Sequence, residues 1–156
     1  MQLRSRPALY SVLSGCVWAM IGYGIAYSVS PILSTPLELG RVFLGGVVAA
    51  PCIGLLIGMI SRKFTALGRP GRVAVALADL YLATWLFLLA TGIARFLGEF
   101  SGLAHQIAYR ALLVDPAIGA LLGLTYTGYV LVLWPLSYAN HLVVARAWTV
   151  SNAMRG

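Results

Sequence analysis

Charged residues are scarce in this chain. Only 10% of its 156 residues are charged, with four acids against eleven lysines and arginines, while 60% are hydrophobic and the mean hydropathy is +0.89. Soluble domains carry about 25% charged residues, so the composition excludes a soluble protein. Four long stretches carry no charge at all, over 7–37, 42–61, 80–94 and 116–145.

Cysteine and catalytic motifs are also lacking. The two cysteines, Cys16 and Cys52, lie in apolar stretches and form no C-x-x-C pair, which excludes a thiol oxidoreductase and indicates packing residues. The chain contains no phosphate-binding loop, no H-E-x-x-H and no G-x-S-x-G. It also has no cluster of acids and histidines at metal spacing. The sequence therefore predicts neither an enzyme nor a metal site.

Four apolar segments are long enough to cross a membrane, which takes about 20 helical residues. They lie at about 8–29, 42–60, 73–94 and 117–145. The first begins like a signal peptide but has no clear A-x-A cleavage site, so we interpret it as a spanning helix. The sequence predicts an all-α integral membrane protein whose residues 1–156 form a single membrane domain.

Basic residues in the predicted loops give the orientation. Eight fall on one side and three on the other, and the loop 61–72 alone holds four of the eight. Cytoplasmic loops carry the excess of lysine and arginine in membrane proteins. We therefore expect the chain in a bacterial inner membrane, with both termini on the cytoplasmic side. The +7 net charge is spread over loops rather than gathered on one face, so we expect no nucleic-acid partner.

The segment of about 95–113 has a helical pattern of its own. Apolar residues recur at steps of four, three and four, at Phe96, Phe100, Leu103 and Ile107. Polar residues occupy another face, which predicts an amphipathic helix in the outer interface between the third and fourth spans. This helix either connects two spans, docks onto a partner or covers something bound between the spans.

Small residues recur every fourth position in the second span, at Gly46, Ala50, Gly54 and Gly58. Such a stripe lets a neighbouring backbone approach closely. The neighbour is either another helix of the same chain or another subunit, and the sequence leaves both open.

Asp79 is the single acidic residue inside a predicted span. A carboxylate at this depth is costly, so it marks either a proton or cation site or a pair with a basic group such as Arg72. If Asp79 is paired, its partner could also be a basic group of another protein or water near the interface.

His141 lies in the fourth predicted span, after Asn140. A helix-borne imidazole among apolar residues can ligate haem iron or the magnesium of a bacteriochlorophyll, as a single axial ligand. The alternative is an interfacial or hydrogen-bonded histidine. The cofactor is otherwise unknown, and bound lipids are expected.

Two functions are compatible with these observations. The first, which the sequence favours, is a non-catalytic accessory subunit of a respiratory or photosynthetic membrane complex. It would pack against other integral membrane subunits, lipids or pigments. The alternative is a small homo-oligomeric proton-coupled transporter or channel that uses Asp79.

Overall fold

The computed structural model describes residues 6–29, 36–98 and 105–153. Every element in these ranges is an α-helix: α1 (Arg6–Val29), α2 (Pro36–Phe64), α3 (Arg69–Gly98), α4 (His105–Tyr126) and α5 (Tyr129–Ala153). Four helices are long and apolar enough to cross a membrane, over Pro7–Ile25, Gly40–Phe64, Arg69–Ala94 and Tyr129–Ala153. The prediction of an all-α protein with four long apolar helices is confirmed for this part of the chain, consistent with an integral membrane protein.

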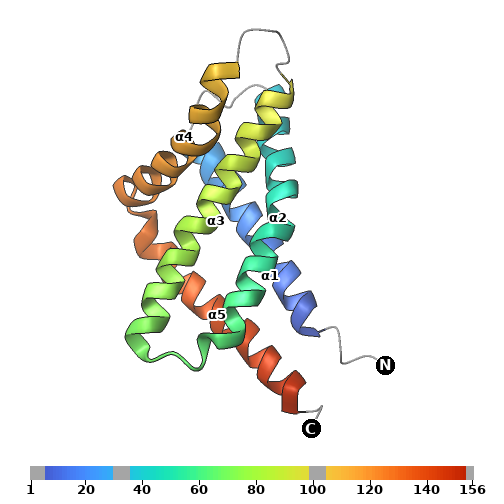
Figure 1. Ribbon diagram of the computed structural model, residues 1–156, viewed down its shortest axis with the longest axis vertical. Coiled ribbons are helices and arrows are strands. Elements are labelled where there is room, and N and C mark those ends of the chain that lie inside the picture. The colour runs from blue at the N-terminus through green and yellow to red at the C-terminus, as the bar shows by residue number, and fades with distance from the viewer. Residues whose placement is uncertain (1–5, 30–35, 99–104, 154–156) are drawn as a thin grey trace.

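The long helices run side by side along the longest axis of the molecule (Figure 1). Helix α2 packs against both α1 and α3, and α5 contacts all three of them. The start of α1, the end of α5 and the α2–α3 connection lie at the same end of the molecule (Figure 1). This arrangement agrees with the charge pattern, which assigned these three regions to one side.

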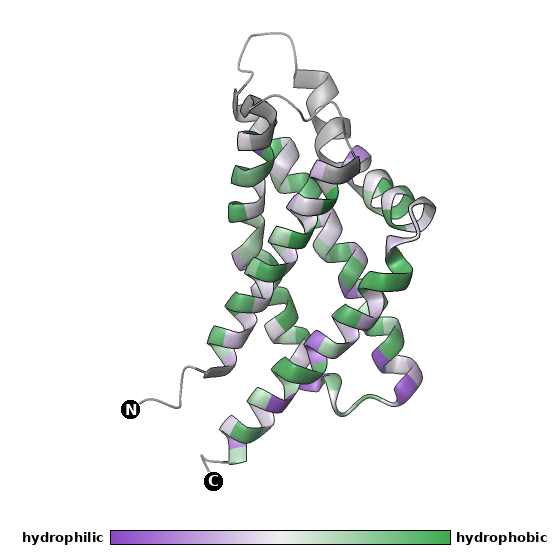
Figure 2. Ribbon diagram, turned by 180° about the vertical axis from the view of Figure 1, so that it is seen from behind, coloured by the Kyte–Doolittle hydropathy of each residue, from purple (hydrophilic) through white to green (hydrophobic). Residues whose placement is uncertain are grey.

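Hydrophobic residues are spread along the long helices (Figure 2), and many of them lie on the outside of the molecule. Leu13, Met20, Val48 and Leu131 are each more than half exposed. An exposed apolar surface of this kind is ordinary where lipid is the solvent. Several of the hydrophilic residues lie near the end that carries both termini (Figure 2).

The prediction of one continuous helix over 117–145 is wrong. Helix α4 ends at Tyr126 and α5 begins at Tyr129. Gly128 between them has a φ of 69°, a left-handed conformation that commonly ends a helix at glycine. The Thr127 hydroxyl accepts a hydrogen bond from the Tyr129 amide at 3.5 Å, at the start of α5. Hydropathy stays high across this turn, so an apolar run alone did not reveal it.

A separate amphipathic helix over about 95–113 is not confirmed. Residues 95–98 form the end of α3, while His105 begins α4, which continues to Tyr126. Phe100 and Leu103 lie outside the described residues, and the side chains of Phe96 and Ile107 are not described. The outer segment is therefore divided between two helices.

The α2–α3 connection is closed by Arg72. Its Nε donates to the Leu67 carbonyl at 2.8 Å and its Nη2 donates to the Thr65 carbonyl at 2.7 Å. Carbonyls beyond a helix end lack intrahelical partners, so these bonds stabilise the turn. Arg72 is thereby used in the connection, and the sequence hypothesis that it pairs with Asp79 is not what the structure shows.

Glycines allow α1 and α2 to pack at backbone contact. A Cβ added at Gly15 would lie 2.7 Å from the Gly54 nitrogen, and one added at Gly54 would lie 2.7 Å from the Ser11 carbonyl oxygen. At Gly58 the nearest atom would be Ser11 Oγ at 2.8 Å. Side chains would force the two helices apart, so close approach depends on these positions.

Candidate functional site

Asp79 lies on α3 and is buried between helices. Only 2% of its surface is exposed. Its Oδ2 lies 3.1 Å from Nε2 of His141, on α5. Among the described residues, its Oδ1 has no hydrogen-bond partner. A buried carboxylate with one unsatisfied oxygen is costly in a spanning helix, which makes it a candidate functional group.

His141 is fully buried and both of its ring nitrogens are engaged. Nε2 faces Asp79, and Nδ1 lies 2.9 Å from the Ser61 hydroxyl. Both contacts are hydrogen bonds when Nε2–H donates to the carboxylate and the Ser61 hydroxyl donates to Nδ1, and we assign this tautomer on that basis. The Phe64 ring stacks on the imidazole, with centroids 4.9 Å apart and planes at 23°.

Ser61 was missed by the sequence reasoning, which placed it in the loop 61–72. Helix α2 continues to Phe64, so Ser61 is helical and fully buried. Helical periodicity could have identified Ser61. Ile53 and Ile57 are buried four residues apart, and Ser61 lies a further four residues along the same face. The basic residues that follow, Arg62 and Lys63, concealed this continuation.

Further polar contacts join α5 to its neighbours around this cluster. The Ser137 hydroxyl donates to the Ala76 carbonyl of α3 at 3.0 Å. The Asn140 amide donates to the Ser14 hydroxyl of α1. Interhelical hydrogen bonds of this type replace water as partners for polar groups inside a membrane. They hold α5 in the register that brings His141 to Asp79.

The arrangement around His141 does not fit an axial ligand to haem or bacteriochlorophyll. Ligation needs a ring nitrogen with its lone pair directed at the metal. One nitrogen faces Ser61, the other faces Asp79, and Phe64 covers a face of the ring. Among the described residues, no group of three potential ligands could hold a metal ion.

This group of side chains can hold a proton: it consists of Asp79, His141 and Ser61. Asp79 and His141 are the two sequence-predicted candidates, and the fold brings them into one hydrogen-bonded cluster with Ser61, called here the polar cluster. A carboxylate beside an imidazole can exchange a proton over one hydrogen bond. The unpartnered Oδ1 of Asp79 is a second place where a proton can reside.

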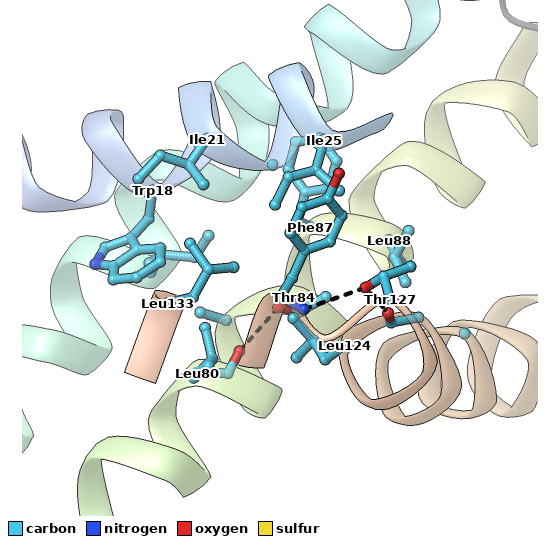
Figure 3. A pocket seen from close by; sticks show the side chains of 16 residues that line it. Trp18, Ile21, Ile25, Leu80, Thr84, Phe87, Leu88, Leu124, Thr127 and Leu133 are labelled. Carbon is cyan, nitrogen blue, oxygen red and sulfur yellow. Dashed lines mark hydrogen bonds between the residues drawn. The ribbon is translucent and has the colours of Figure 1, made fainter. Parts of the chain in front are cut away.

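An apolar cavity of about 300 Å³ is lined by residues of the helices that carry the polar cluster. Figure 3 shows the side chains that line it. Leu80 directly follows Asp79, and Ala83 lies one turn farther along α3. Both residues line the cavity, together with Leu133 of α5. Trp18 and Thr127 project toward it from opposite sides (Figure 3). Two of the three helices that carry the polar cluster, α3 and α5, therefore also form part of the cavity wall.

The small-residue stripe of α2 faces helices of its own chain. Gly54 and Gly58 lie against α1, and Ala50 is buried. A Cβ at Gly46 would lie 3.3 Å from the Phe87 ring of α3. In this structure the stripe packs against α1 and α3.

Comparisons with known proteins bring no further information about the site. No protein-family model, no curated protein and no solved structure matches this chain.

Proposed function

We propose that this chain is a small proton-coupled membrane transporter in which Asp79 and His141 carry the proton. The observation that supports the proposal is their pairing at 3.1 Å, in a site where at most 2% of either side chain is exposed. Ionisable residues are rare inside spans, and they mark proton relays and substrate pathways. The two residues come from different helices, so their pairing is sensitive to helix movement.

The coupling step follows from the hydrogen bonds. A proton that binds Asp79 neutralises the carboxylate and weakens its attraction for the Nε2–H of His141. Because this bond joins α3 to α5, its weakening would loosen the contact between the two helices at this depth, while the Ser137–Ala76 hydrogen bond still connects them. Both helices line the cavity, through Leu80 and Leu133. Proton binding would thereby change the cavity wall.

Orientation forms part of the proposal. The chain lies in a bacterial inner membrane. The end that carries both termini and the α2–α3 connection faces the cytoplasm, as the excess of basic residues predicts. The polar cluster lies toward that end, since Ser61 is one turn from the end of α2 at Phe64. The proton would therefore be exchanged with the cytoplasmic side.

The accessory-subunit hypothesis has less support among the described residues. One of its candidate interfaces was the stripe at Gly54 and Gly58, and α1 occupies that surface. Its other candidate surface, the face with Phe100 and Leu103, lies outside the described residues. We therefore prefer transport.

Proton flux into vesicles tests the proposal. The purified chain is reconstituted in liposomes with an encapsulated pH dye, and a pH gradient is imposed. We expect Asp79→Asn to abolish the flux, while the matched change Asp115→Asn, at an exposed position of α4, leaves it intact. Equal flux in both variants would overturn the proposal.

A further inference from the structure

Among the described residues, the cavity bounded by α1, α2, α3, α4 and α5 has no charged residue in its wall. Its lining is made of aliphatic and aromatic side chains, three glycines and two threonines. A binding site for an ion or a charged molecule needs opposite charges or several convergent dipoles. This lining therefore selects against charged ligands.

The two threonines of the wall have already used their protons. Thr84 Oγ1 donates to the Leu80 carbonyl at 2.9 Å, and Thr127 Oγ1 donates to the Gly123 carbonyl. Each hydroxyl can still accept a hydrogen bond but has no proton to donate. The other lining residues that carry a polar side-chain atom are Tyr129, with its hydroxyl, and Trp18, with its indole N–H. A water molecule in a cavity requires two to four polar partners, and these few groups are too sparse to hold a filling of water.

The size of the cavity narrows the ligand further. An apolar cavity of about 150 Å³ is large enough to bind benzene. The present cavity, of about 300 Å³, has twice that volume. It is suited to a bicyclic hydrocarbon or to a short length of alkyl chain.

We propose that this cavity binds an uncharged hydrocarbon, either as the acyl chain of a lipid or as a free apolar molecule about the size of two benzene rings. The proposal names the substrate class of the transporter and rests on the proposed function for movement of the ligand. Its binding does not depend on that function. Ligand contact would come from Trp18, Phe87 and Leu133, which line the cavity from three helices.

Gly123 gives a way to fill the cavity without disturbing the helices. It lines the cavity, and an added Cβ would have no atom within 4 Å. Gly123→Leu should therefore place a side chain in the ligand volume. Gly24 of α1 is matched, since it also has nothing within 4 Å but does not line the cavity. Gly24→Leu is the control.

Quenching of Trp18 fluorescence measures occupancy. The full chain, with Trp85, Trp134 and Trp148 changed to Phe, is placed in lipid nanodiscs and titrated with 1-bromonaphthalene. A second series uses phosphatidylcholine with brominated acyl chains. We expect saturable quenching of the parent and of Gly24→Leu, and at least about tenfold weaker binding to Gly123→Leu, as expected when an apolar pocket loses space for its ligand. The probe that shows this difference identifies the source of the hydrocarbon.

Native mass spectrometry provides a readout that needs no tryptophan change. Gly24→Leu in the otherwise unaltered chain should retain bound 1-bromonaphthalene or brominated lipid, and Gly123→Leu should lose it. Equal quenching in the two variants with both probes, or equal adducts in the spectra, would overturn the proposal. Loss of proton flux in Asp79→Asn with unchanged binding in Gly123→Leu would reject the cavity ligand alone. Unchanged proton flux in Asp79→Asn with weakened binding in Gly123→Leu would reject the transport function alone.

Discussion

His141 Nε2 lies 3.1 Å from Asp79 Oδ2, although 62 positions separate the two residues in the chain. Asp79 is held by α3 and His141 by α5, so the bond links two spanning helices. With Ser61 on the other nitrogen, the imidazole joins three helices through one ring. Four predictions follow for this cluster, for the helix packing and for the orientation.

Removing His141 should destabilise the protein more than removing both members of its pair with Asp79. His141→Leu leaves a buried carboxylate without a partner, which costs about 3–5 kcal/mol. Asp79→Leu combined with His141→Leu removes that unsatisfied group, so part of the loss should be recovered. Reversible unfolding in mixed micelles with a denaturing detergent measures both free energies. The single variant Asp79→Leu completes the comparison. If the loss of unfolding free energy in the double variant equals the sum of the losses in the two single variants, the two residues do not interact.

Ser61 should set the tautomer of His141. Ser61→Ala removes the hydroxyl that lies 2.9 Å from Nδ1, so the ¹⁵N chemical shifts of the imidazole should change. The stability loss should be small, about 0.6 kcal/mol for an average membrane hydrogen bond. Ser137→Ala is the control, because that hydroxyl donates to the Ala76 carbonyl and not to the imidazole. Identical spectra for the two variants would contradict the assignment.

Gly15 should not tolerate alanine. An added Cβ would lie 2.7 Å from the Gly54 nitrogen, so α1 and α2 would have to separate, at a cost of about 1–3 kcal/mol. Gly24→Ala on the same helix meets no atom within 4 Å and should be neutral or slightly stabilising. Unfolding free energies of the two variants provide the comparison. Equal stability would show that backbone contact between α1 and α2 is not required.

The end with both termini should face the cytoplasm. In a chain with Cys16 and Cys52 changed to serine, Ala66→Cys in the α2–α3 connection and Asn152→Cys near the end of α5 provide exposed thiols. Both should resist a membrane-impermeant maleimide applied to intact cells and react after the cells are opened. Gly40→Cys, near the other end of α2, should react in intact cells. The opposite labelling pattern would reverse the orientation.

Gly128 also illustrates what an apolar sequence can conceal. The run 117–145 was predicted as one helix because it contains no charge, yet the chain turns at Gly128, where φ is 69°. Hydropathy measures transfer into lipid and does not register a single backbone rotation. The TG pair was the available signal, since glycine readily adopts this conformation at a helix end.

The sequence by itself determined the class of the protein. Scarce charge and long apolar segments predict spanning helices. In lipid no water is present to pair with the backbone N–H and C=O groups, so these groups must form hydrogen bonds within the chain. It also singled out Asp79 as a costly carboxylate and His141 as a candidate ligand or hydrogen-bonded residue within those helices. Periodicity and hydropathy are local properties, and each can be read from one segment at a time.

Only the tertiary structure decided how these segments meet. The pairing of Asp79 with His141 depends on the relative depth and rotation of α3 and α5, and the place of Ser61 depends on α2 extending to Phe64. The use of Gly54 against α1 and the cavity beside Leu80 likewise arise from several helices at once. Long-range packing sets these relations, because each contact joins residues whose sequence neighbourhoods carry no information about each other.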